Sequence, residues 1–247
     1  MNTRRQFVAA SAATIAVTTL GTKSVFAELE ETGLTLQNAS FIESAGAAST
    51  PAASPEASPE TTELRGYIFG DPEAPNTLRI FGDYRCPHCR AFAKDTEPQL
   101  IEEFVKSGQL NLEFVDFTVI QVPSFEELGD DSIESVQAAE AAACAAEQDG
   151  YLAYRDWLFS GELVTEDGGF SNENLIAAAE ELGLDADQFG EALESGKYEQ
   201  AIIESVTLGL EIGVQGTPTF TLNDGEPFFA PEGGYEPFKS VIEPELN

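Results

Sequence analysis

The stretch YRCPHCRAF, residues 84–92, holds two cysteines three positions apart around a Pro–His pair. Thiols at this spacing can bind a metal ion, form a structural disulfide or exchange disulfides with other thiols. Each of these three chemistries needs different partners elsewhere in the chain. The remaining sequence therefore has to separate them.

A structural zinc site usually takes four cysteine or histidine ligands. The chain has only one further cysteine, Cys144, and its one histidine is His88, inside the pair. His88 cannot chelate a metal together with both neighbouring cysteines, and a copper carrier would need a distal histidine. We therefore expect no metal and no cofactor, and a metal-binding domain completed by carboxylates is the non-catalytic alternative.

A purely structural disulfide between Cys86 and Cys89 is the second alternative. It would close a very small loop and remove little entropy from the unfolded chain. The redox interpretation fits better, because Cys86 lies where a strand is expected to end and a helix to begin. Helix N-termini present free N–H groups and a positive partial charge, and cysteines there have pKa values of about 3.5–7.5 instead of about 8.5.

The flanking residues fit a redox disulfide Cys86–Cys89. Pro87 suits the first helical turn, where its missing N–H costs nothing. Cys89 lies one turn after Cys86 on the same helix face and can resolve a mixed disulfide formed there. We expect His88, Arg85 and Arg90 to favour the Cys86 thiolate.

The elements around this pair read as a strand–helix–strand unit. Apolar runs predict strands at residues 64–69, 77–84 and 110–120. A helix is expected from the cysteines to about Lys106, kinked at Pro98. This order predicts a right-handed crossover and a parallel strand pair.

A helical block is expected over about 130–210, rich in Ala, Leu, Glu and Gln. Strand signals return over 217–230, with a tight turn at Asn223-Asp224-Gly225, and a short helix closes the chain at 235–242. Four residues of the helical block are predicted to be core rather than a functional cluster: Cys144, Tyr154, Trp157 and Phe159.

Two motifs together carry a family resemblance. FGDYRCPHCRAF at 81–92 and GVQGTPTF at 213–220 resemble the DsbA-like branch of the thioredoxin superfamily. The resemblance covers residues 64–247 and implies an α/β, thioredoxin-like fold with a helical insertion between the strand–helix–strand and strand–strand–helix units. It also implies that Pro218 follows a cis peptide bond and faces the cysteines, and that Thr217 offers its backbone to an extended substrate segment.

The resemblance implies a dithiol–disulfide exchange enzyme acting on exported proteins, with a membrane redox partner of the DsbB or vitamin-K-epoxide-reductase type. An oxidase is favoured, because a stabilised Cys86 thiolate makes the disulfide easier to reduce. A reductase remains open, since Thr217 before Pro218 also occurs in reducing relatives, and an isomerase is less favoured. Many relatives carry a buried acid six residues before the first cysteine, where this chain has Ile80, and Asp83 is the nearest acid.

The charge of the chain is strongly negative. Its formal net charge is −32, and it is −35 from Glu28 onward, because three basic residues and no acidic ones precede that point. Such a polyanion repels nucleic acid and anionic lipid, whereas molar salt shortens the screening length to about 3 Å. The composition resembles proteins of extreme halophiles, so we expect a haloarchaeal source. A monomer is the default expectation.

The N-terminus predicts export. Residues 1–27 combine Arg4-Arg5, a short apolar run and a small-residue cleavage site, and they resemble a twin-arginine signal peptide. An uncleaved signal anchor is the alternative. Residues 28–63 are rich in Ala, Ser and Pro and are predicted to be a disordered tether. Export places the domain over 64–247 outside the cytoplasmic membrane, where disulfides persist.

Overall fold

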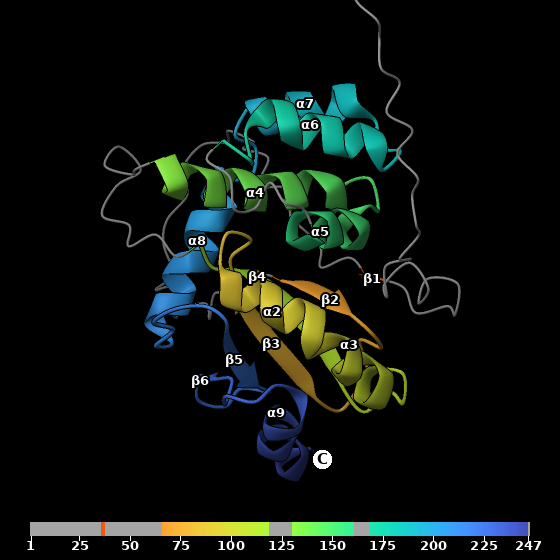
Figure 1. Cartoon of the computed structure of the whole chain (residues 1–247), viewed down its shortest axis with the longest axis vertical. Helices are drawn as coiled ribbons and strands as arrows, with labels where there is room; N and C mark the ends of the chain where they lie inside the picture. Colours follow the sequence, from red (N-terminus) through yellow and green to blue (C-terminus); the bar gives the residue numbers. More distant parts are fainter. Residues whose placement is uncertain (1–35, 38–65, 119–129, 161–167, 247) are drawn as a thin grey trace, which may run out of the picture.

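The structure is a computed structural model and describes residues 36–37, 66–118, 130–160 and 168–246 (Figure 1). Its sheet has the strand order β1-β2-β4-β3-β5-β6. Only β3 and β4 run parallel, and every other neighbouring pair is antiparallel. The strands are β1 (Leu36–Gln37), β2 (Tyr67–Phe69), β3 (Thr77–Gly82), β4 (Asn111–Asp116), β5 (Thr219–Leu222) and β6 (Phe228–Phe229).

The centre of the sheet is the predicted parallel pair β3–β4. Most of β4 is buried, as its nearly continuous apolar run predicts. The ladder runs from Thr77 opposite Asn111 to Gly82 opposite Asp116. The carboxyl ends of both strands therefore meet at one edge, and Cys86 follows β3 at that edge.

The crossover between β3 and β4 is an interrupted helix. It comprises α2 (Pro87–Asp95), α3 (Glu97–Leu100) and a π-helical turn (Ile101–Val105). The break falls at Thr96, two residues before Pro98, and agrees with the predicted kink. Pro98 has no N–H with which to continue the hydrogen-bond ladder of α2.

The predicted helical block is present, and Figure 1 shows α4 to α7 above one end of the sheet, while α8 runs down beside it. Its helix α4 packs against α5, α7 and α8, while α5 contacts α2 and α8 contacts β4. The block is thereby anchored to the elements that carry the cysteines. Its helices are α4 (Asp130–Ala146), α5 (Tyr151–Ser160), α6 (Asn172–Glu181), α7 (Ala186–Glu194) and α8 (Glu199–Glu211).

The C-terminal unit is the expected hairpin followed by a helix. Asn223 takes a positive φ of 54° in the turn, and the Gly225 N–H donates to the carbonyl of Leu222 at 3.0 Å. Strands β5 and β6 then pair antiparallel, and α9 (Tyr235–Ile242) follows, with a 3-10 turn at Glu243–Glu245. The predicted turn is confirmed.

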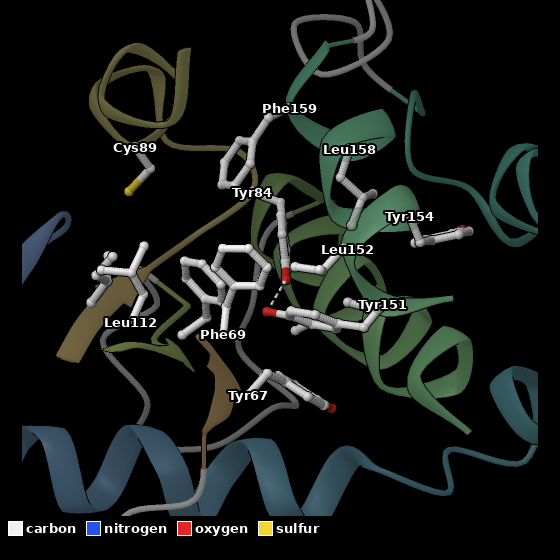
Figure 2. Packing of buried hydrophobic residues seen from close by; sticks show 14 of the residues in the cluster. Tyr67, Phe69, Tyr84, Cys89, Leu112, Tyr151, Leu152, Tyr154, Leu158 and Phe159 are labelled. Atoms are coloured by element: carbon white, nitrogen blue, oxygen red, sulfur yellow. Dashed lines mark hydrogen bonds between the residues drawn. The ribbon is translucent and has the colours of Figure 1, made fainter. Parts of the chain in front are cut away.

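Aromatic side chains fill the main core of the protein, which is one continuous cluster of buried residues. Phe220 of β5 packs against Phe92 of α2 and Phe238 of α9, with ring centroids 4.6 and 4.8 Å away. Figure 2 shows a second group in which Tyr84 lies beside Phe159 and directs its hydroxyl toward Tyr151. Of the residues predicted to be core, Cys144, Tyr154 and Phe159 are buried, and Trp157 is half-buried against them.

Several sequence predictions fall outside the described residues. These include the signal peptide over 1–27 and the tether over 28–63, apart from Leu36 and Gln37, which pair with β2. Among the helices of the described part, none combines the length and apolar character needed to cross a bilayer.

Candidate active site

Cys86 and Cys89 occupy unequal positions at the start of α2. Cys86 is the N-cap residue, with extended backbone angles of φ −75° and ψ 119°, and Pro87 is the first helical residue. Cys86 is half-buried, whereas Cys89 is only 3% exposed. Both are free thiols in this structure. An incoming molecule can therefore reach Cys86 more readily than Cys89.

The second predicted motif lies directly against Cys86. The Thr217–Pro218 peptide bond is cis, as the resemblance implied. The Cys86 thiol donates to the carbonyl of Thr217 at 3.3 Å, although the two residues are 131 positions apart. The antiparallel pairing of β5 with β3, with Thr219 opposite Phe81, brings this segment beside the cysteines.

The two thiols differ in acidity. The pKa of Cys86 is lowered from 9.0 to about 5, chiefly by a hydrogen bond from the Cys89 thiol. The Thr217 side chain and the backbone N–H groups of Cys89 and His88 add to this effect, while burial opposes it. Burial, followed by the proximity of Cys86, raises the pKa of Cys89 well above its usual range. At neutral pH the pair is thus a Cys86 thiolate beside a Cys89 thiol.

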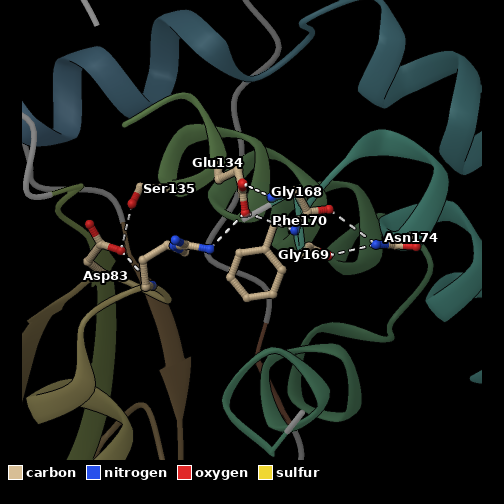
Figure 3. Close-up of polar contacts among 8 residues, drawn as sticks. Asp83, Glu134, Ser135, Gly168, Gly169, Phe170 and Asn174 are labelled. Carbon is tan, nitrogen blue, oxygen red and sulfur yellow. Dashed lines mark hydrogen bonds and ion pairs between the residues drawn. The ribbon is translucent and has the colours of Figure 1, made fainter. Parts of the chain in front are cut away.

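The basic side chains contribute less than expected. Arg85 does not direct its charge at Cys86 alone, because its guanidinium forms a 2.9 Å ion pair with Glu134, and both partners are largely buried. Glu134 also accepts from the N–H groups of Gly168 and Phe170, at 2.6 and 3.0 Å (Figure 3). His88 acts on Cys86 through its backbone N–H, and its side chain is exposed. Hydrogen bonds at the helix start account for the low pKa better than the flanking charges do.

Asp83 organises the turn into α2. Its buried carboxylate accepts from the backbone N–H of Arg85 at 2.7 Å and from the Ser135 hydroxyl at 3.0 Å (Figure 3). Its carbonyl accepts from the N–H of Cys86 at 3.1 Å. The nearest acid in sequence is therefore engaged in holding the loop.

A small, partly open cavity lies behind Cys89. It has a volume of about 20 Å³, and its lining includes Cys89, Ile80, Asp116 and Pro218. Asp116 as a whole residue is only half-buried, but burial of its carboxyl raises the pKa from 3.8 to about 7. The sequence prediction missed Asp116. Its position could have indicated a role, because it is an acid at the end of an apolar strand, and that strand was predicted to run parallel to the one before the cysteines.

A larger groove opens on the outside of the same site, with a volume of about 430 Å³. Phe229 on its rim is 60% exposed, and the groove reaches the Thr217–Pro218 segment next to Cys86. Its lining includes His88, Phe92, Thr217, Pro218, Phe229 and Phe238. Such a surface suits an extended peptide with apolar side chains. Among the described residues, no group of three or more His, Cys, Asp or Glu side chains is placed to hold a metal ion.

Known proteins share this architecture. The family model described as Thioredoxin matches residues 62–243. Disulfide bond formation protein D of Bacillus subtilis is 25% identical over 187 residues, which cover 73% of this chain and 77% of the relative. The structure of oxidised BdbD from Bacillus subtilis superposes with a TM-score of 0.61 at 24% identity, covering 72% of this chain and 91% of that one. The structure of DsbA from Chlamydia trachomatis gives 0.58 at 20% identity, covering 80% and 97%. The predicted α/β, thioredoxin-like fold is thereby confirmed.

Proposed function

Since the chain belongs to the thioredoxin family and is a thiol–disulfide oxidoreductase, we propose that it donates disulfides to exported proteins through Cys86 and Cys89. The observation that carries this proposal is the unequal acidity of the two thiols at the start of α2. At neutral pH Cys86 is ionised and Cys89 is not, so Cys86 is the thiol that can attack. Its low pKa of about 5 also makes Cys86 the better leaving group.

The proposed reaction has two exchange steps. A substrate thiolate attacks Cys86 of the Cys86–Cys89 disulfide, the S–S bond breaks, and Cys89 leaves with the electron pair and takes a proton. A second substrate thiolate then attacks the substrate sulfur of the mixed disulfide, and Cys86 leaves as a thiolate. The substrate loses two electrons and the enzyme gains them. A disulfide-bearing membrane partner, of the DsbB or vitamin-K-epoxide-reductase type, would take them up.

Substrate recognition is proposed to use the groove beside Cys86. The backbone of Thr217, which precedes Pro218, would pair with an extended substrate segment, while the apolar lining holds its side chains. Backbone pairing is insensitive to sequence. The site would therefore accept many unfolded substrates, as a general disulfide donor requires.

Export and a saline exterior are proposed from the sequence. Arg4-Arg5 and the charge of −35 beyond residue 27 support secretion into high salt. Changing both arginines to lysine should retain the protein inside the cell, and unimpaired export of this variant would remove the twin-arginine route.

Trapping of mixed disulfides tests the proposed function. Cys89→Ser should accumulate covalent complexes with exported proteins, because the resolving thiol is missing. The matched variant, Cys86→Ser, should accumulate none, because it lacks the exposed nucleophile. Equal trapping by both variants, or trapping by neither, would refute the assignment.

A further inference from the structure

The proposed exchange leaves one proton without a source. Cys89 leaves the disulfide as an anion and becomes a thiol whose pKa is well above its usual range, because it is buried. The position six residues before Cys86, where many relatives carry an acid, holds Ile80. Asp83 is committed to Ser135 and to the backbone of Arg85. The proton must therefore come from another group in the interior next to Cys89.

Such a group, Asp116, lines the same cavity as Cys89. The cavity volume of about 20 Å³ exceeds the minimum of about 10–15 Å³ that one water needs. Cys89, Gly82 and Asp116 all line it. Gly82 lies opposite Asp116 in the parallel ladder, and a Cβ placed on Gly82 would be 3.9 Å from Cys89 Sγ. The absence of a side chain at Gly82 leaves this space open.

The surroundings of Asp116 tune its acidity. Burial is the largest effect and raises its pKa to about 7, and the negative charge of Asp83 adds to it. A hydrogen bond with Tyr84 and the charge of Arg155 act in the opposite direction. Arg155 is itself held by Glu97 through two 2.8 Å bonds. The charge of Asp116 in turn acts on Tyr67 and Tyr151, and Cys89 lines the same cavity.

We propose that Asp116 is the proton-relay residue for Cys89, acting through one water in the cavity between them. When the disulfide is reduced, the Asp116 carboxyl gives its proton to the water, and the water gives one to the departing Cys89 thiolate. When the disulfide forms again, the Asp116 carboxylate takes a proton back by the same route as Cys89 attacks Cys86. The electrons stay on the sulfur atoms throughout, so the relay needs no redox partner of its own.

Both directions work near neutral pH. A relay with a pKa near the working pH is populated in its acid and its base form, which is the condition for efficient general acid–base catalysis. This inference rests on the proposed use of Cys86 and Cys89 as an exchanging pair. It goes beyond that proposal by naming where the proton of the second thiol goes.

The test measures closure of the disulfide. The reduced protein is mixed with glutathione disulfide, which forms a mixed disulfide on Cys86, and acid-quenched mass spectrometry follows its resolution by Cys89. The wild-type rate should rise through an inflection near pH 7, as the Asp116 carboxylate forms. In Asp116→Asn, the rate at neutral pH should fall about 10²-fold and the inflection should vanish.

Two further variants separate a relay from a structural role. Asp156→Asn removes a carboxyl whose pKa burial likewise raises to about 7, but which is not among the residues lining the cavity, so its rate and inflection should match the wild type. Ile80→Glu, added to Asp116→Asn, puts an acid back into the same cavity and should restore a pH-dependent rate. If Asp116→Asn keeps the pH inflection, the proposal is overturned, whatever the absolute rate of this variant. So would a folded double variant that stays as slow as Asp116→Asn.

A measurement on the unaltered protein covers the case in which Asp116→Asn fails to fold. The ¹³C signal of the Asp116 carboxyl should titrate near pH 7 and should shift between the oxidised and the reduced protein, because Cys89 lies across the cavity. A midpoint near the usual value of about 4 in both states would overturn the relay. A wild type that forms no Cys86–Cys89 disulfide would refute the proposed function and the relay with it. If the wild type forms its disulfide normally and Asp116→Asn shows the same pH profile of disulfide closure, the relay is refuted but the proposed function is not.

Discussion

The low pKa of Cys86 makes the stability of the reduced protein depend on pH. In the folded state this pKa is about 5, and the ordinary value for the unfolded chain is 9.0. A group whose pKa is lowered by folding contributes stability in full above its unfolded pKa and loses it as the pH falls through its folded pKa. Each unit of pKa difference corresponds to about 1.4 kcal/mol, so the thiolate stabilises the folded protein by at most about 2.7 kcal/mol at pH 7 and by almost nothing below pH 5. Solvent reduces this value, because Cys86 is only half-buried.

The oxidised protein has no thiolate and serves as the matched reference. Other titrating groups, such as Glu140, are present in both redox states, so their effects largely cancel in the difference. Urea unfolding of both forms in molar NaCl, between about pH 5 and pH 7, should show the reduced protein gaining up to about 2 kcal/mol relative to the oxidised one. A stability difference that does not change over this range would refute the low pKa of Cys86 and the reasoning built on it.

Three further predictions concern the scaffold. Arg155→Met leaves Glu97 buried without its two 2.8 Å bonds, and it should lower the free energy of unfolding by about 3–5 kcal/mol in urea titrations. If the double variant with Glu97→Met loses less, the unpaired charge of Glu97 is the cause. Gly209→Ala would place a Cβ 2.6 Å from the Phe117 ring and should cost about 1–3 kcal/mol in the same assay; a stabilised variant would contradict the packing of α8 on β4. Raising NaCl to molar concentration should raise the melting temperature, because the net charge of −35 then repels itself less; no rise would remove the halophile interpretation.

The elements of the fold were predictable because local chemistry determines them. Apolar runs specified β3 and β4, and the Asn223–Gly225 turn specified the hairpin that follows β5. Pro98 predicted the interruption of the crossover helix. The break nevertheless falls at Thr96, because a proline disrupts the turn before it rather than its own position.

The site was predictable only in part, because its parts meet through long-range pairing. The approach of Thr217 to Cys86 depends on the pairing of β5 with β3, and the family resemblance, rather than any local pattern, predicted it. The ion pair of Arg85 with Glu134 joins residues 49 positions apart, and the sequence therefore gave no reason to discount that charge. Asp116 faces the cavity only because the parallel register sets it opposite Gly82, and a shift of one residue would turn it to the other face of the sheet.

The reduction potential of the Cys86–Cys89 couple tests the central claim most directly. The thiolate stabilisation of at most about 2.7 kcal/mol at pH 7 belongs to the reduced form alone, and about 1.4 kcal/mol corresponds to 30 mV for this two-electron couple. This stabilisation raises the potential by at most about 60 mV relative to the same couple without a thiolate. Equilibration with glutathione buffers in molar salt should give a disulfide donor a potential well above thioredoxin's value of about −270 mV. A potential at or below about −270 mV would contradict the oxidase assignment and identify the protein as a reductase.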